Sequence, residues 1–213
     1  LEQVQLAVMD AGFTRESLRG RKIGVFVGIS TADAVNVSLE ASGRQESVFA
    51  LNCHDHATAA GRISFLFGFL GPCVAYNTAC SSSLVALHAA VRSLQAGECE
   101  MAVVAGVNAI LSPDVSRRFA AAGMLSPTGR CHTFDAASDG YVRGEGCGTV
   151  LLNRASRLSD LRKIYAIIDG VSVCQDGPST NITSPNGTAQ QRLLETALSD
   201  AGVRGEQIDY VEA

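Results

Sequence analysis

Apolar and polar residues follow one another along this chain in patterns that predict helices and strands in turn. Helical spacing of apolar positions predicts helices over residues 2–11, 57–67, 81–95 and 189–201, and a short one near residues 34–41. Runs rich in β-branched residues predict strands over residues 23–27, 73–77, 101–107, 148–152, 164–173 and 208–211. Strand, helix and strand within residues 73–107 form a βαβ unit, which implies parallel strands and a right-handed crossover. The predicted fold class is therefore α/β.

Residues 112–146 show no such pattern and are rich in glycine, serine, proline and charge. A connection of this length is too long to be passive, so we expect a functional loop. Its glycines permit close approach of the backbone to a ligand, although no phosphate-binding glycine motif is present. The sequence leaves open whether Arg143 and Glu145 serve the structure of a solvated loop or contribute to a site.

A short string of residues occurs near both ends of the chain. Asp10-Ala11-Gly12 ends one predicted helix and Asp200-Ala201-Gly202 ends another, and each is followed by a short loop and a predicted strand. Glycine directly after a helix is a common C-terminal cap. The repetition is either a coincidence or the trace of a duplicated fold whose second half starts near Leu161.

Composition limits the partners that this chain can have. The 213 residues are 46% apolar and 18% charged, as in buried α/β structure, with a formal net charge of −4. Lys and Arg form no large cluster, which argues against nucleic acid or an anionic membrane as a partner. No apolar run has membrane-spanning length, and no signal peptide is recognisable. Seven cysteines without CxxC spacing favour a reducing, intracellular and cytoplasmic location over a disulfide framework.

Cys80 is the most informative residue of the chain. A predicted strand ends at Asn77, small residues follow, and a predicted helix begins directly behind the cysteine. Unpaired N–H groups and the positive end of the helix dipole favour the thiolate, which is the nucleophilic form. A free cysteine is more often a small buried hydrophobic residue. Its position and its small neighbours favour a catalytic nucleophile here, with its own N–H available to an oxyanion.

The sequence does not supply an obvious base for this thiol. Helix-end effects are worth only about 0.3–1 kcal/mol, so a second activating group is needed, normally a histidine. His88 lies more than two helical turns beyond Cys80, and His132 has no better claim than a surface histidine. Four neighbouring residues resemble a metal cluster at first sight: Cys53, His54, Asp55 and His56. Their spacing fits no standard zinc site, so we expect no metal.

Residues 77–88 resemble the active-site signature of β-ketoacyl synthases. The three serines at positions 81–83 are most similar to the ketosynthase domains of modular (type I) polyketide synthases. Other stretches resemble the family in the same order: residues 59–64, Gly71-Pro72, residues 105–108, Phe134-Asp135, Asp139-Gly140, residues 144–146 and residues 183–187. The resemblance therefore covers nearly the whole chain.

The resemblance implies a thiolase-like α/β fold of two similar halves, each a sheet covered by helices. We expect this fold to be truncated at both ends here. Residues 1–160 would form the N-terminal half without its start, and residues 161–213 the beginning of the C-terminal half.

The resemblance also implies a decarboxylative Claisen condensation. In that reaction the cysteine, here Cys80, receives an acyl group as a thioester, and the enolate of a decarboxylated malonyl-type extender attacks it. The Cys80 N–H matches one oxyanion-hole donor of the family. The implied partners are an acyl carrier protein, a second copy in a homodimer and other polyketide synthase domains. No cofactor is implied, because the substrates are carried on the phosphopantetheine arm of the carrier protein.

Two catalytic histidines of the family lie in its second half, and the first opens a His-Gly-Thr motif that follows Val-Glu-Ala. Val211-Glu212-Ala213 ends this sequence, so we expect an internal fragment that does not catalyse condensation alone. Asn77 stands where aspartate is usual, and Cys174 stands where asparagine is usual. A fatty-acid 3-oxoacyl-carrier-protein synthase and a non-catalytic ketosynthase-like structural or carrier-binding module are the alternatives.

Overall fold

The structure is a computed structural model that describes residues 1–34, 37, 55–154 and 163–212. Its centre is a four-stranded sheet of β1 (Ile23–Gly28), β2 (Cys73–Tyr76), β3 (Met101–Asn108) and β4 (Gly146–Asn153). The strand order is β2-β1-β3-β4. Strands β2 and β3 both run parallel to β1, and β4 pairs with β3 in the antiparallel direction. The four predicted strands up to residue 153 and the βαβ unit are therefore confirmed.

Side chains of the central strands alternate between the two faces of the sheet, as the period of a β-strand requires. Ile23, Val25 and Val27 pack on one face together with alternate residues of β3. Phe26 packs on the other face beside Ala102. Burying a large apolar side chain stabilises the fold by about 1.5–3 kcal/mol, so both faces contribute to the core.

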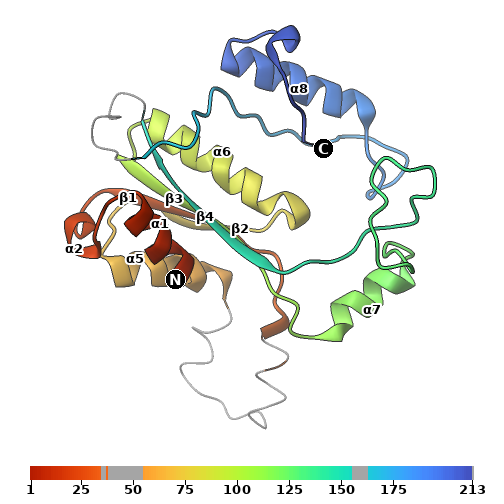
Figure 1. The fold of residues 1–213 in the computed structure, drawn as a ribbon, viewed down its shortest axis with the longest axis horizontal. Helices are drawn as coiled ribbons and strands as arrows, with labels where there is room; N and C mark the ends of the chain where they lie inside the picture. Colours follow the sequence, from red (N-terminus) through yellow and green to blue (C-terminus); the bar gives the residue numbers. More distant parts are fainter. Residues whose placement is uncertain (35–36, 38–54, 155–162, 213) are drawn as a thin grey trace.

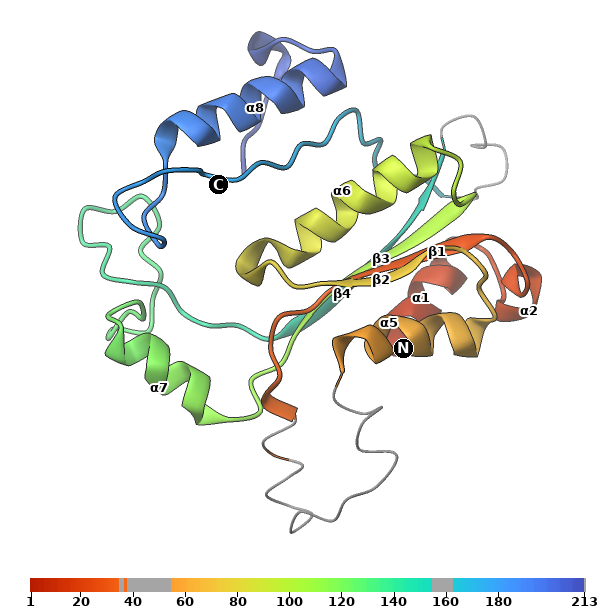
Figure 2. The ribbon, with the colours of Figure 1, turned by 180° about the vertical axis from the view of Figure 1, so that it is seen from behind.

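Helices cover both of these faces (Figure 1). On one side lie α1 (Glu2–Asp10), the short α2 (Arg15–Leu18) and α5 (His56–Phe67); on the other lies α6 (Ser82–Gln95). Figure 2 shows the same layers from behind, with α6 between the sheet and the C-terminal part of the chain. The C-terminal part contains α8 (Gly187–Ala201) and the 3₁₀ turn η3 (Gly205–Gln207). Helices α1, α5, α6 and α8 confirm the four long helices expected from the sequence, whereas the short one near residues 34–41 lies largely outside the described residues.

The expectation of a continuous loop over residues 112–146 is wrong, because α7 (Pro113–Ala121) lies within it. Ser112 caps this helix by accepting a hydrogen bond from the Asp114 N–H, and proline occupies its first turn. A serine cap is a standard helix start because its side chain satisfies a free N–H of the first turn. Proline is also common there, since the N–H it lacks would have no partner within the helix. The Ser112 N–H also donates to the carboxylate of Asp33, which is only 4% exposed, so the segment after β1 anchors the start of α7.

The two strands expected over residues 164–173 and 208–211 are also not observed. Both segments lie outside any β-ladder in the described part of the chain. A strand requires hydrogen bonds to a neighbouring strand, which a run of β-branched residues favours but does not supply. Side chains hold the first segment instead. Asp10 accepts hydrogen bonds from Lys163 and Tyr165 near its start, and Asp200 accepts one from the Val171 N–H near its end.

The repeated Asp-Ala-Gly string forms the same helix end twice. Gly12 has a φ of +81° and Gly202 a φ of +68°, the left-handed conformation that glycine adopts without strain. After each glycine the next N–H bonds back five residues, from Phe13 to the Val8 carbonyl and from Val203 to the Leu198 carbonyl. This pattern is the Schellman motif. The repetition is thus structural as well as sequential.

Within residues 1–34, 55–154 and 163–212, none of the helices has both the length and the apolar character needed to cross a membrane.

Candidate active site

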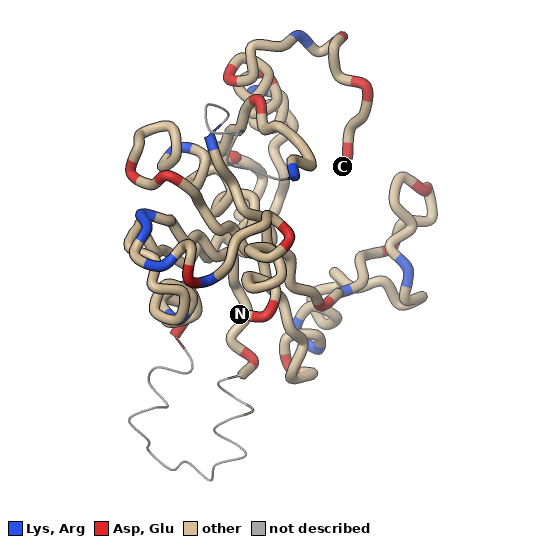
Figure 3. Tube along the Cα trace, turned by 60° about the vertical axis from the view of Figure 1, so that its left-hand side comes forward, with Lys and Arg blue, Asp and Glu red and all other residues tan. Residues whose placement is uncertain are grey.

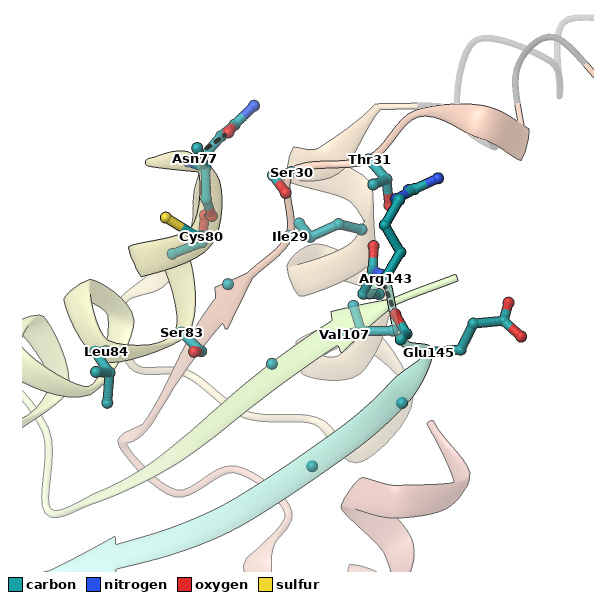
Figure 4. A pocket seen from close by; sticks show the side chains of 18 of the residues that line it. Ile29, Ser30, Thr31, Asn77, Cys80, Ser83, Leu84, Val107, Arg143 and Glu145 are labelled. Carbon is teal, nitrogen blue, oxygen red and sulfur yellow. Dashed lines mark hydrogen bonds between the residues drawn. The ribbon is translucent and has the colours of Figure 1, made fainter. Parts of the chain in front are cut away.

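Cys80 lies where the chain leaves the sheet and enters α6. Strands β1, β2 and β3 run in the same direction, so their carboxyl ends meet at one edge of the sheet, where ligands of open α/β sheets bind. The short 3₁₀ turn η1 (Ala79–Ser81) connects β2 to α6 at that edge. The Cys80 thiol is free and exposed there (Figure 4). Helix α6 begins directly behind the turn, so the positive end of its dipole faces the cysteine.

The backbone of this turn is held in a strained conformation. Ala79 has a φ of +55°, which costs a residue with a Cβ on the order of 1–3 kcal/mol. Side chains of the turn supply hydrogen bonds that offset this cost. Asn77 accepts from the Ala79 N–H at 3.3 Å, and Ser81 donates to the Thr78 carbonyl at 2.9 Å. The strain is therefore localised directly before Cys80.

Two glycines allow the start of α6 to lie against the sheet. A Cβ on Gly28, the last residue of β1, would lie 2.5 Å from the backbone nitrogen of Ser83. A Cβ on Gly106 of β3 would lie 2.8 Å from the Ser83 Cβ. Real Cβ atoms do not approach other atoms so closely, so only glycine fits at these two positions. The contact fixes the height of Cys80 above the strand ends.

A cavity of about 1060 Å³ lies in front of Cys80. Its floor is the carboxyl-terminal part of β1 and β3 together with β4, and α6 forms one wall. The lining that comes from η1, α6 and the middle of β3 consists of small or apolar residues around Cys80 itself: Ala79, Ser82, Ser83, Leu84, Leu87 and Val104. An acyl chain has the size and apolarity that such a wall accommodates.

The wall opposite Cys80 comes from α7 and from the end of the loop after it. Figure 4 shows Arg143 and Glu145 of that loop across the cavity from Cys80. The Arg143 guanidinium lies 5.7 Å from the centre of the Phe119 ring and donates a 2.7 Å hydrogen bond to the Ser116 hydroxyl. The Tyr141 ring packs edge-on against Phe119 with 6.2 Å between ring centres. Arg143 thus ties the loop to α7 through a cation–π contact and a hydrogen bond.

Glu145 and Asn108 fix the same loop to the end of β3. The Glu145 carboxylate accepts a 2.6 Å hydrogen bond from the Ile110 N–H, and the Asn108 amide donates a 2.6 Å hydrogen bond to the Gly144 carbonyl. The sequence left open whether Arg143 and Glu145 are structural or belong to a site. Both alternatives hold. Arg143 and Glu145 line the cavity, and their polar atoms also hold the loop in place.

Comparison with known proteins identifies the family. Residues 1–157 match the family model "Beta-ketoacyl synthase, N-terminal domain", and residues 165–213 match "Beta-ketoacyl synthase, C-terminal domain". The chain belongs to the β-ketoacyl synthase family. This confirms the resemblance that the sequence motifs indicated.

Relatives of this ketosynthase chain are components of polyketide synthases. The chain is 45% identical over 212 residues to one component of the phenolphthiocerol/phthiocerol polyketide synthase of Mycobacterium tuberculosis, a match that covers 97% of the chain and 10% of the relative. It is 41% identical over 214 residues to another component of the same synthase from that species, with 100% and 11% covered. The chain therefore spans about a tenth of the length of these curated relatives.

Solved structures of ketosynthase domains have the same fold. The oxazolomycin ketosynthase domain OzmH KS7 from Streptomyces albus superposes with a TM-score of 0.88 at 36% identity, covering 99% of this chain and 38% of that one. The module 6 ketosynthase of the bacillaene synthase from Bacillus subtilis superposes with a TM-score of 0.89 at 35% identity. The match covers 99% of this chain and 35% of that one. The expected thiolase-like α/β fold is thus confirmed.

None of the histidines in the described part of this ketosynthase lines the cavity. His56 contacts the Thr31 carbonyl at 3.0 Å from the start of α5, and His132 contacts the Thr128 hydroxyl at 3.0 Å. His88 lies within α6, and His54 is outside the described residues together with Cys53. Across the described ranges, no three His, Cys, Asp or Glu side chains are grouped so that they could hold a metal ion.

Two residues of the ketosynthase depart from the usual family pattern. Asn77 accepts the Ala79 N–H through its side-chain oxygen, which an aspartate oxygen would do equally well. Cys174 donates from its thiol to the Ala189 carbonyl at 3.8 Å and is not among the residues that line the cavity. Neither substitution disturbs the turn that carries Cys80.

Phe119 and Tyr141 line the cavity but were not predicted from the sequence, because the composition of residues 112–146 suggests an irregular loop. The Ser112-Pro113-Asp114 start of α7 was the signal that would have placed Phe119 on a helix.

Lysine, arginine and acidic residues are scattered over the described chain, and Figure 3 shows positively and negatively charged residues in all of its parts.

Proposed function

We propose that this chain carries the nucleophile of a ketosynthase that acts in polyketide biosynthesis. Support comes from the position of Cys80, an exposed thiol in a strained turn before α6 that faces a cavity with mostly small and apolar residues near the thiol. Its relatives carry polyketide synthase names, which favours this branch over fatty-acid synthesis.

In the proposed reaction the Cys80 thiolate attacks the carbonyl carbon of an acyl thioester on an acyl carrier protein. A new C–S bond forms, the C–S bond to the phosphopantetheine thiol breaks, and that thiolate takes up a proton. The Cys80 N–H donates to the oxyanion of the tetrahedral intermediate. A malonyl-type extender then loses carbon dioxide, and its enolate attacks the Cys80 thioester, which forms a carbon–carbon bond and releases the cysteine.

The residues that line the described cavity include no histidine that could activate the Cys80 thiol or donate to the enolate oxygen of the second step. The resemblance places two catalytic histidines in the second half of the family. We propose that the whole protein provides them, and that residues 1–213 by themselves do not catalyse condensation, because groups of this kind act as a unit. We also propose that the enzyme is intracellular and uses no cofactor of its own.

We propose a homodimer that forms along β2. This strand is at the edge of the sheet, and β1 is its only neighbour among the described strands. Val74 on this strand is exposed. An exposed edge is a template for pairing with another strand, and a second copy supplies one. Sedimentation of the wild type and of Val74→Asp, expected to be dimer and monomer respectively, tests this part.

The test of the function is a condensation assay with the whole ketosynthase. Acyl and malonyl carrier proteins are supplied, and the β-ketoacyl product is measured by mass spectrometry. Product is expected with the wild type and with Cys147→Ala, and none with Cys80→Ala. A wild type that forms no β-ketoacyl product would instead support a non-catalytic, carrier-binding module. Preference for unbranched saturated acyl chains would favour the fatty-acid alternative.

A further inference from the structure

Ser82 is the first residue of α6, and its hydroxyl makes two hydrogen bonds within the strained turn, beside a third from its own N–H to the Ala79 carbonyl. Its side chain is buried, with only 5% of the residue exposed. The hydroxyl oxygen accepts from the Thr78 N–H at 2.9 Å and donates to the Ala79 carbonyl at 2.6 Å. A serine hydroxyl has one hydrogen and two lone pairs, so it makes both bonds at once.

The bond to the Ala79 carbonyl has a consequence for the next residue. The Ala79 carbonyl and the Cys80 N–H belong to one planar trans peptide group, so they point in opposite directions. A hydroxyl that draws the carbonyl toward the buried start of α6 turns the Cys80 N–H the other way. Ser82 therefore sets the direction of the N–H donor on the nucleophile itself.

The strain at Ala79 makes this control necessary. A residue with a Cβ leaves the left-handed region unless its surroundings hold it there. Leaving that region requires rotation about the N–Cα bond of Ala79, which would move the Ala79 carbonyl and the Cys80 N–H relative to Thr78. The Ser82 hydroxyl binds groups on both sides of that bond, the Thr78 N–H and the Ala79 carbonyl, so it opposes this rotation directly.

The sheet fixes Ser82 in turn. A Cβ on Gly28 would lie 2.6 Å from the Ser82 carbonyl carbon, so the helix start rests directly on the end of β1. The other serines of the turn cannot replace Ser82. Ser81 is exposed and donates to Thr78, and the Ser83 side chain lies over Gly106.

We propose that Ser82 is a positioning residue for acyl transfer, whose hydroxyl orients the Ala79–Cys80 peptide so that the Cys80 N–H serves as oxyanion donor. The proposal rests on the proposed function, because an oriented N–H matters only if Cys80 attacks a carbonyl. It adds a role that the Ser82 side chain exerts through the backbone, because its hydroxyl binds the Ala79 carbonyl.

Two reactions of the same thiol separate this role from a general structural one. Acylation by an acyl-N-acetylcysteamine thioester passes through a tetrahedral oxyanion, whereas alkylation by iodoacetamide is a direct displacement at carbon without one. Both rates at Cys80 are measured in the whole ketosynthase by peptide mass spectrometry. Ser82→Ala is expected to slow acylation roughly 10- to 100-fold, which approaches the loss of an oxyanion donor, and to leave alkylation within about twofold.

Ser82→Thr and Ser93→Ala complete the experiment. Ser82→Thr retains the hydroxyl and is expected to acylate within about threefold of the wild type. Ser93 is another buried serine of α6, hydrogen-bonded to Cys99, and its alanine variant is expected to keep the wild-type ratio of acylation to alkylation. The proposal would be overturned if Ser82→Ala kept the wild-type ratio of acylation to alkylation, whether both rates fell together or neither changed. It would also be overturned if Ser82→Thr acylated as slowly as Ser82→Ala. A wild type whose Cys80 is not acylated at all would overturn the proposed function itself.

Discussion

The Arg92 guanidinium lies 2.8 Å from the Asp200 carboxylate and joins the helix behind Cys80 to the end of α8. Arg92 also donates to the Val171 carbonyl at 3.0 Å, and Asp200 accepts from the Val171 N–H at 2.9 Å. The two side chains thus bind both backbone groups of one residue in the extended segment 163–173. This arrangement fixes the C-terminal part of the chain to α6 without a β-ladder.

Acid is expected to release this segment. The Val171 N–H, and after it the Arg92 guanidinium, hold the pKa of Asp200 below its ordinary value. Hydrogen bonds from Tyr165 and Lys163 do the same for the pKa of Asp10. A carboxylate with a lowered folded-state pKa stabilises the fold above the unfolded pKa of about 4, and this contribution is lost as the pH falls through the folded value. Amide hydrogen exchange between pH 6 and pH 3 measures the loss.

Asp200→Asn is expected to exchange rapidly over residues 165–173 already at pH 6, with little further change on acidification. Glu206→Gln is the matched control, because Glu206 pairs with Arg204 on the exposed surface and lies in the same part of the chain. Equal protection of residues 165–173 in the wild type and in Asp200→Asn at pH 6 would show that this ion pair does not hold the segment.

Gly28→Ala tests the contact between β1 and the start of α6. The added Cβ would lie 2.5 Å from the Ser83 nitrogen, so the helix start must move. Overpacking of this kind costs about 1–3 kcal/mol in free energy of unfolding, and the shift carries Cys80 with it. Urea denaturation and the rate of Cys80 acylation are both expected to report the change.

Gly61→Ala is the control for Gly28→Ala, and it should raise the free energy of unfolding rather than lower it. Gly61 lies within α5, and its Cβ would meet no atom within 4 Å, so alanine is expected to stabilise the helix by up to about 1 kcal/mol. Stability losses of equal size in both variants would indicate that crowding at Ser83 is not the cause.

Arg143→Lys probes the wall opposite the nucleophile. Lysine keeps the charge but cannot reproduce the planar guanidinium that packs on Phe119 and reaches Ser116. The loop that lines the cavity should loosen, so we expect KM for the acyl substrate to rise about three- to tenfold, the equivalent of one hydrogen bond, with a smaller change in kcat. Arg117→Lys on the exposed side of α7 is expected to leave KM unchanged within about twofold, as exposed pairs contribute little. A KM for Arg143→Lys equal to that of the wild type would contradict this account of the loop.

The central sheet and the turn at Cys80 could be predicted from sequence because local pattern and burial agree there. Val25 and Phe26 alternate between two covered faces, and the small residues before α6 permit only a tight turn. The segment 163–173 could not be predicted, since its β-branched residues encode extended backbone but not the partner that holds it. That partner consists of Asp10 and Asp200, which lie far away in the sequence.

The cavity wall opposite Cys80 was harder to predict for a related reason. Phe119 and Arg143 are 24 positions apart in a stretch whose composition suggests an irregular loop, and only their packing brings them together. The role of Ser82 was equally hidden, because a serine in a run of three carries no signal that distinguishes it from its neighbours. Its burial and its two hydrogen bonds become visible only in the folded turn.

The most direct measurement of the central claim locates the acyl group. The whole ketosynthase is incubated with an acyl thioester and no extender, then digested and mapped by mass spectrometry without reduction. The acyl mass is expected on the peptide that contains Cys80, and on no peptide of the Cys80→Ala variant. Acyl groups spread evenly over Cys80, Cys131 and Cys147, which are all exposed, would contradict the claim that Cys80 is the nucleophile.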